Sequence, residues 1–216
     1  MIALITGLVL TVSIPNAGNE LPDVYDIADA MTDIRNKIDA KDAVKMAGAA
    51  LEAGVRFEVD PLFLLAVAYV ESRWTVRVKP GDKGKSFGIF QMTFGVGKRV
   101  DFAGLFEDEL EYCGDGKERA TMRWALEDIW SATHVAAAYI AHLRRKYGKR
   151  KSVYDVMVIY NCGPTRCKQS NGTQRRVTPA TRGYWRTYRR LKKAVHRIES
   201  MKCEPGTPDG YKDKDA

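Results

Sequence analysis

The chain of 216 residues contains few of the side chains that usually bind metals. It has three histidines and four cysteines, and the histidines are scattered along segments with helical periodicity. No two cysteines have the Cys-x-x-Cys spacing that is typical of a zinc site. We therefore expect no metal site.

Long apolar runs are also scarce. The one such run covers residues 1–14, which is short for a membrane span, and small residues follow at 16–18. We interpret residues 1–18 as a signal peptide; because no Lys or Arg precedes the run, an N-terminal apolar anchor is the alternative. Export would place the cysteines in an oxidising compartment, where three pairings are open and Cys162 with Cys167 would close a short loop.

Acidic residues are fewer than basic ones, 27 against 35, and the resulting net charge of +8 favours anionic partners. Basic residues concentrate at 144–151 and 182–197, where aromatic residues are interleaved in the second run. A nucleic-acid surface is one interpretation. Since no nucleic-acid motif accompanies the charge, we favour solvated helix faces that also attract other anionic polymers, and we expect no nucleic-acid partner.

Sustained strand alternation is missing, whereas helical periodicity recurs along the chain. It predicts two helices within residues 22–54, with Gly54 ending the second, and further helices at 126–147, 152–160 and about 183–201. A hydrophobic content of 45% excludes wholesale disorder, and 29% charged residues exclude a multispan membrane protein. We predict one all-α domain over residues 19–202 and a charged, disordered tail over 203–216.

Glu71 stands out near the end of an apolar helix. Asp60 and Pro61 form a helix start, and every residue from 62 to 70 is apolar. Helical spacing places Glu71 on one face with Leu64 and Ala68. Apolar surroundings would raise the pKa of a carboxyl group and make it a proton donor. The alternative, favoured if the helix is considered alone, is a glutamate that points to solvent or pairs with an arginine.

Two later segments carry polar groups suited to sugars. Residues 86–92 (Ser-Phe-Gly-Ile-Phe-Gln-Met) contain Gly88, which permits a close backbone approach, and Gln91, whose amide both donates and accepts hydrogen bonds. Tyr160 and Asn161 end a helix before a Gly-Pro turn. Each segment is a weak signal by itself.

Taken in order, Glu71-Ser72, Gly88-Ile89-Phe90-Gln91 and Tyr160-Asn161-Cys162-Gly163 resemble the three motifs of the soluble lytic transglycosylase (SLT) family. The resemblance covers roughly residues 58 to 190. It implies a lysozyme-like α fold and non-hydrolytic cleavage of the MurNAc-β-1,4-GlcNAc bond of peptidoglycan, which leaves a 1,6-anhydroMurNAc end. It implies no cofactor.

The resemblance also assigns roles. Glu71 would protonate the glycosidic oxygen and then, as a base, take a proton from the muramoyl 6-hydroxyl. Phe90 and Met92 would pack in the core. The residues expected around the substrate are Ser86, Gly88, Gln91, Tyr160, Asn161 and Tyr184. In the family a tyrosine of the last helix also approaches the glutamate, and we expect Tyr184 in that place, chosen over Tyr188.

The sequence departs from the family pattern in two places. Residues 82–86 replace the usual serine-rich loop, and the resemblance implies that Ser86 would stand in for a family serine. Cys162 replaces the usual alanine and suggests a disulfide with Cys167, two free thiols being the alternative.

Two other functions remain open. A hydrolytic lysozyme would need a second carboxylate, for which Asp82 and Asp101 are the candidates. A non-catalytic glycan-binding or structural component of a phage particle or secretion apparatus is less consistent with Glu71 and Gln91. We expect a monomer that binds peptidoglycan glycan strands in the periplasm or another extracytoplasmic site, with envelope-spanning machinery or virion proteins as further partners.

Overall fold

The protein is mainly helical. The computed structural model describes residues 21–81, 83–97, 118–147, 156–161 and 178–202. Within these ranges, seven helices have assigned bounds, residues 156–161 are also helical, and one two-stranded sheet is present. The all-α prediction is therefore confirmed. The expected signal peptide or anchor (1–18) and tail (203–216) lie outside the described residues, so these domain bounds stay predictions.

The first two helices are α1 (Val24–Ile34) and α2 (Ala40–Phe57). Each begins at an aspartate whose side chain accepts main-chain N–H bonds, Asp23 for α1 and Asp39 for α2. The prediction that Gly54 ends the second helix is wrong. Gly54 is buried inside α2, where a Cβ would lie 2.8 Å from the Val59 carbonyl oxygen, so this glycine permits a close turn onto the next segment.

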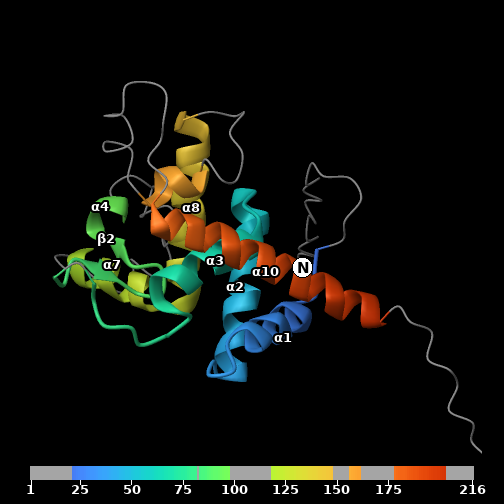
Figure 1. Cartoon of the computed structure of the whole chain (residues 1–216). Coiled ribbons are helices and arrows are strands. Elements are labelled where there is room, and N and C mark those ends of the chain that lie inside the picture. The colour runs from blue at the N-terminus through green and yellow to red at the C-terminus, as the bar shows by residue number, and fades with distance from the viewer. Residues whose placement is uncertain (1–20, 82, 98–117, 148–155, 162–177, 203–216) are drawn as a thin grey trace, which may run out of the picture.

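The central helix, α3 (Pro61–Ser72), begins where the sequence predicts. Asp60 accepts hydrogen bonds from the N–H groups of Leu62 (2.9 Å) and Phe63 (3.4 Å). All residues from 61 to 68 are buried. A helix that is apolar on every side must be enclosed by others, and α3 packs against both α2 and α10. Figure 1 shows it near the middle of the molecule, with α10 lying across it.

A short hairpin follows α3. Strand β1 (Ser86–Phe87) pairs antiparallel with β2 (Met92–Thr93), Ser86 opposite Thr93, and α4 (Phe94–Gly97) continues from it. The hairpin lies beside α7 and α4 on one side of the molecule (Figure 1). Phe90 and Met92 are buried in the core, as the sequence predicts.

The helix expected at 126–147 is divided. Helix α7 (Glu118–Glu127) ends before Asp128, and α8 (Ile129–Tyr147) begins after it. The Asp128 carboxylate accepts a hydrogen bond from the N–H of Ser131 at 2.9 Å, which is an N-terminal cap for α8. The chain therefore turns at Asp128, and α7 packs against the hairpin while α8 packs against α2.

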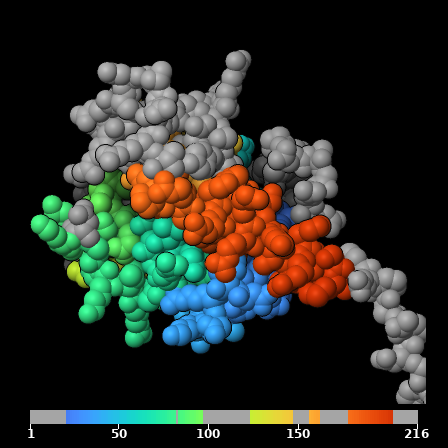
Figure 2. All heavy atoms as spheres, viewed as in Figure 1, coloured from blue at the N-terminus to red at the C-terminus, as the bar shows by residue number. Residues whose placement is uncertain are grey.

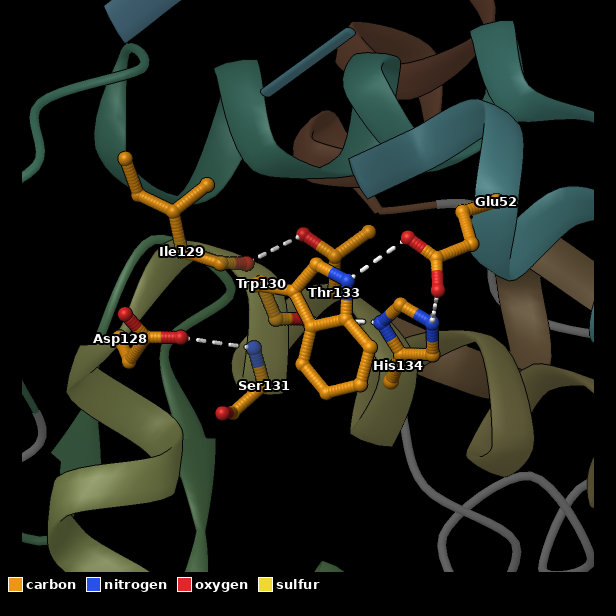
Figure 3. Close-up of polar contacts among 7 residues, drawn as sticks. All are labelled: Glu52, Asp128, Ile129, Trp130, Ser131, Thr133 and His134. Atoms are coloured by element: carbon orange, nitrogen blue, oxygen red, sulfur yellow. Dashed lines mark hydrogen bonds and ion pairs between the residues drawn. The ribbon is translucent and has the colours of Figure 1, made fainter. Parts of the chain in front are cut away.

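Packing between α2 and α8 includes a buried histidine (Figure 3). His134 stacks on Trp130, with ring centroids 3.8 Å apart, and its Nδ1–H donates to the Trp130 carbonyl oxygen at 2.9 Å. Trp130 Nε1 donates to Glu52 at 2.8 Å, whereas His134 Nε2 lies 3.7 Å from the same carboxylate. Burial lowers the pKa of His134, so we expect a neutral ring at neutral pH.

The last helix, α10 (Pro179–Lys202), begins four residues before the predicted start. Its buried side contacts α3 and α1, and its other side is open at the molecular surface (Figure 2). The exposed side carries basic residues, among them Arg186, Arg190 and Lys193, as expected for solvated faces. Within the described ranges, no helix is both long and apolar enough to cross a membrane.

Candidate active site

Glu71 occupies the last turn of α3, where the apolar helix comes to the edge of the core. The helix ends because Arg73 and Trp74 have left-handed φ values of 56° and 53°. The Trp74 ring then folds back, buried, and donates from Nε1 to the Leu65 carbonyl oxygen at 2.8 Å. Glu71 is left half-buried. The Arg73 guanidinium lies over the Tyr69 ring, 4.7 Å from its centroid, and no ion pair joins it to Glu71 among the described residues.

Helix α10 brings a phenol to this carboxylate. The Tyr184 hydroxyl donates a short hydrogen bond to Glu71 Oε1, and Tyr184 is fully buried. Gly183 packs closely on α3, where a Cβ would lie 3.2 Å from Val70 Cγ2. Tyr188 is directed elsewhere: its hydroxyl donates to Asp60 Oδ2 at 2.6 Å, at the opposite end of α3.

Residues 156–161 contribute two further side chains. Asn161 Nδ2 donates to the Tyr184 hydroxyl oxygen at 3.4 Å. The Tyr160 ring lies edge-on to that of Tyr184, with centroids 6.3 Å apart, and its hydroxyl donates to the Phe90 carbonyl oxygen at 3.3 Å. Tyr160 thus links the Glu71 cluster to the connection between β1 and β2.

Gln91 fixes the conformation of the connection between β1 and β2. Its Nε2 donates to the Gly88 carbonyl oxygen and its Oε1 accepts from the Gly81 N–H, each at 2.9 Å. A Cβ at Gly81 would lie 2.3 Å from Gln91 Oε1, so a larger residue there would displace the end of the Gln91 side chain. Ser86, whose main chain pairs with Gly81, is buried in β1. Since an amide has two hydrogens and two lone pairs, Gln91 keeps capacity for one more donor and one more acceptor contact.

Gly88 sits against α7. Its φ is +68°, and a Cβ there would lie 1.5 Å from the Leu126 carbonyl oxygen. This packing by itself requires glycine at the position. A substrate contact at Gly88 stays a prediction.

Burial controls the electrostatics of the cluster. It raises the pKa of the Glu71 carboxyl, and the hydrogen bond from Tyr184 opposes that rise. Burial, followed by the nearby Glu71 charge, also raises the pKa of Tyr160 and of Tyr184. Both phenols therefore remain protonated at neutral pH. They are hydrogen-bond donors, and Glu71 is the titrating group among the three.

In a comparison with protein families, the chain matches the Transglycosylase SLT domain over residues 48–181. The match spans more than half of the chain and contains Glu71, Gln91, Tyr160 and Asn161. The chain belongs to the SLT transglycosylase family. No curated protein and no solved structure matches it.

Membership confirms the lysozyme-like fold and the SLT resemblance seen in the sequence. SLT domains carry peptidoglycan-cleaving activity of the lytic transglycosylase type, so the substrate is the bacterial wall polymer and the activity is extracytoplasmic. Tyr184 lies just beyond the matched range, and its contact with Glu71 depends on how α10 packs.

The structure brings together most of the predicted site. Glu71, Tyr160, Asn161 and Tyr184 are linked by contacts, and Ser86, Gly88 and Gln91 lie in or beside the hairpin. Cys162, Cys167, Asp82 and Asp101 lie outside the described residues. In the described part of the chain, no group of His, Cys, Asp and Glu side chains has the arrangement of a metal site.

Sequence reasoning missed Thr178, Gly81 and Gly183. Thr178 bonds to Asn161, whereas the two glycines permit close approaches at Gln91 and Val70. The Thr178-Pro179 pair is a helix-start signal that could have been read from the sequence.

Proposed function

We propose that the protein is a lytic transglycosylase that cleaves the MurNAc-β-1,4-GlcNAc bond of peptidoglycan and leaves a 1,6-anhydroMurNAc end. The observation that carries this proposal is the environment of Glu71. Burial favours its protonated form, and the Tyr184 hydroxyl stabilises its carboxylate form. A residue that acts first as an acid and then as a base needs both forms to be accessible.

The proposed reaction has two proton transfers through Glu71. The carboxyl group first gives its proton to the glycosidic oxygen as the bond from C1 of MurNAc to that oxygen breaks, and the GlcNAc leaves with the proton. The carboxylate then takes the proton of the MurNAc C6 hydroxyl while O6 bonds to C1. Glu71 is protonated again, and no water is consumed.

The remaining cluster residues would position the sugar and Glu71. Tyr160 is joined to the hairpin through the Phe90 carbonyl group, and Asn161 is joined to Tyr184. Gln91 would present its free amide hydrogen and lone pair to sugar hydroxyl or acetamido groups. The six substrate residues predicted from the sequence stay part of this proposal.

Digestion of purified sacculi in water enriched in ¹⁸O tests the reaction. Transglycosylation predicts anhydro products that are one water lighter than ordinary muropeptides and contain no heavy oxygen. Reducing ends that carry ¹⁸O would instead establish a hydrolytic lysozyme. If no fragment is released although the protein binds the sacculi, it is the non-catalytic glycan-binding component.

A further inference from the structure

Thr178 caps α10 and also contacts the active-site cluster. The Thr181 N–H donates to Thr178 Oγ1 at 3.1 Å, which is the usual N-cap bond. The two threonine hydroxyl oxygens lie 3.1 Å apart. The Thr178 hydroxyl also donates to Asn161 Oδ1 at 2.6 Å. One side chain thus serves both the helix start and Asn161.

The direction of each hydrogen bond follows from the orientation of the Asn161 amide. Asn161 Oδ1 has no hydrogen, so the hydrogen in that contact comes from Thr178. The Thr181 hydroxyl must then donate to Thr178 Oγ1, which receives two hydrogen bonds and has no acceptor site left. This orientation of the Asn161 amide, with Oδ1 towards Thr178 and Nδ2 towards Tyr184, is the one in which every contact pairs a donor with an acceptor when Glu71 is a carboxylate.

The hydrogen bonds run in the same donor-to-acceptor direction from Asn161 to Glu71. Because Asn161 Nδ2 is a donor, the Tyr184 oxygen accepts from it, and the Tyr184 hydrogen is left for Glu71 Oε1. With the opposite amide orientation, Asn161 Oδ1 would face Tyr184 and attract that hydrogen away from Glu71. Since Oε1 is occupied, the proton of the neutral carboxyl group belongs on Oε2.

We propose that Thr178 is a positioning residue that, through Asn161 and Tyr184, holds Glu71 Oε1 in a hydrogen bond and leaves Oε2 to carry the transferred proton. The proposal rests on the proposed function, in which Glu71 is the acid and base. Thr178 acts through other residues. Its loss should therefore change the ionisation of Glu71, which the loss of a helix cap alone would not do.

The test compares the pH dependence of kcat/KM for three variants of the full chain. Thr178→Val removes the hydroxyl, Thr178→Ser keeps it, and Asp39→Ala removes the N-cap of α2, a helix cap that is absent from the Glu71 cluster. Activity requires protonated Glu71, so kcat/KM falls as the pH rises through the pKa of Glu71. Losing the hydrogen bond to the carboxylate raises that pKa.

For Thr178→Val we expect the falling limb of the kcat/KM pH profile to move to higher pH by about half a unit. This corresponds to a change on the order of threefold in the ionisation constant of Glu71. Thr178→Ser and Asp39→Ala should keep the wild-type limb, although Asp39→Ala loses stability. An unmoved limb in a folded Thr178→Val protein would overturn the proposal and leave Thr178 as a cap alone. If Thr178→Val does not fold, Thr178→Gly replaces it, because glycine is an acceptable cap without a hydroxyl.

A second readout separates this proposal from the proposed function. Titration of the Glu71 carboxyl carbon by NMR needs no turnover, so it reports the pKa even in a protein that releases no anhydro product. A higher pKa in Thr178→Val than in Thr178→Ser supports the hydrogen-bond chain whichever reaction occurs. Equal values contradict it.

Discussion

Substitution of Gly88 by alanine should destabilise the protein much more than the same change at Gly84. Both glycines have left-handed φ values, +68° and +84°, so alanine costs each about 1–2 kcal/mol of backbone strain. Nothing lies within 4 Å of a Cβ at Gly84. A Cβ at Gly88 would lie 1.5 Å from the Leu126 carbonyl oxygen, where contacts under 3.0 Å essentially never occur.

The Leu126 main chain would therefore have to move by at least about 1.5 Å, the difference between those two distances. Ala125 and Leu126 are fully buried, so this shift disturbs a packed interface and adds about 1–3 kcal/mol. One kcal/mol corresponds to about 2–4 °C in the melting temperature of a chain of this size. We expect Gly88→Ala to melt several degrees below Gly84→Ala.

Thermal unfolding followed by circular dichroism measures both variants under the same conditions. Equal melting temperatures would refute the argument from packing. If Gly88→Ala were as stable as Gly84→Ala but inactive, the glycine would be needed for substrate approach and not for contact with α7.

Three further predictions concern single side chains. Tyr184→Phe removes the hydrogen bond to Glu71, so the falling limb of the pH profile of kcat/KM should move upward by about one unit; an unchanged limb would contradict the assignment. Because the pKa of His134 is lowered in the folded state, the unfolded state binds more protons below about pH 6.5, and stability should fall there on acidification. Denaturant unfolding at several pH values should show that the free energy of unfolding falls less on acidification for His134→Leu than for the wild type. An equal pH dependence in the two proteins would show that His134 does not cause the fall. Gln91→Met removes two hydrogen bonds to the main chain, so guanidinium unfolding should show a loss of about 1–3 kcal/mol in the free energy of unfolding. Wild-type stability together with a raised KM would instead show that the amide serves only as a substrate contact.

Local signals in the sequence were sufficient for much of the fold. The Asp60-Pro61 pair and the apolar run after it predicted α3 and its burial, because a capping aspartate and an N1 proline act within one turn. The interpretation of Gly54 failed because a glycine that permits close packing inside a helix looks the same in the sequence as one that ends it. The break at Asp128 was missed because apolar periodicity continues on both sides of it.

The candidate site was predictable only as separate parts. The resemblance of the ordered motifs to the SLT family pointed to Glu71, Gln91 and the Tyr160-Asn161 pair before any geometry was known. The contact of Tyr184 with Glu71 joins residues 113 positions apart, between α10 and α3. Local periodicity carries no information about such a contact, and only the family resemblance led us to expect Tyr184 beside the glutamate.

The most direct test of the central claim is the release of anhydro-muropeptides from sacculi by the wild type and by Glu71→Gln, measured by mass spectrometry on equal amounts of folded protein. Glutamine keeps the shape of the side chain and removes the proton that is transferred. The account predicts that the wild type yields 1,6-anhydroMurNAc ends and that Glu71→Gln lowers their rate of release by at least on the order of 10²–10⁴-fold. Anhydro ends released by Glu71→Gln at the wild-type rate would contradict it.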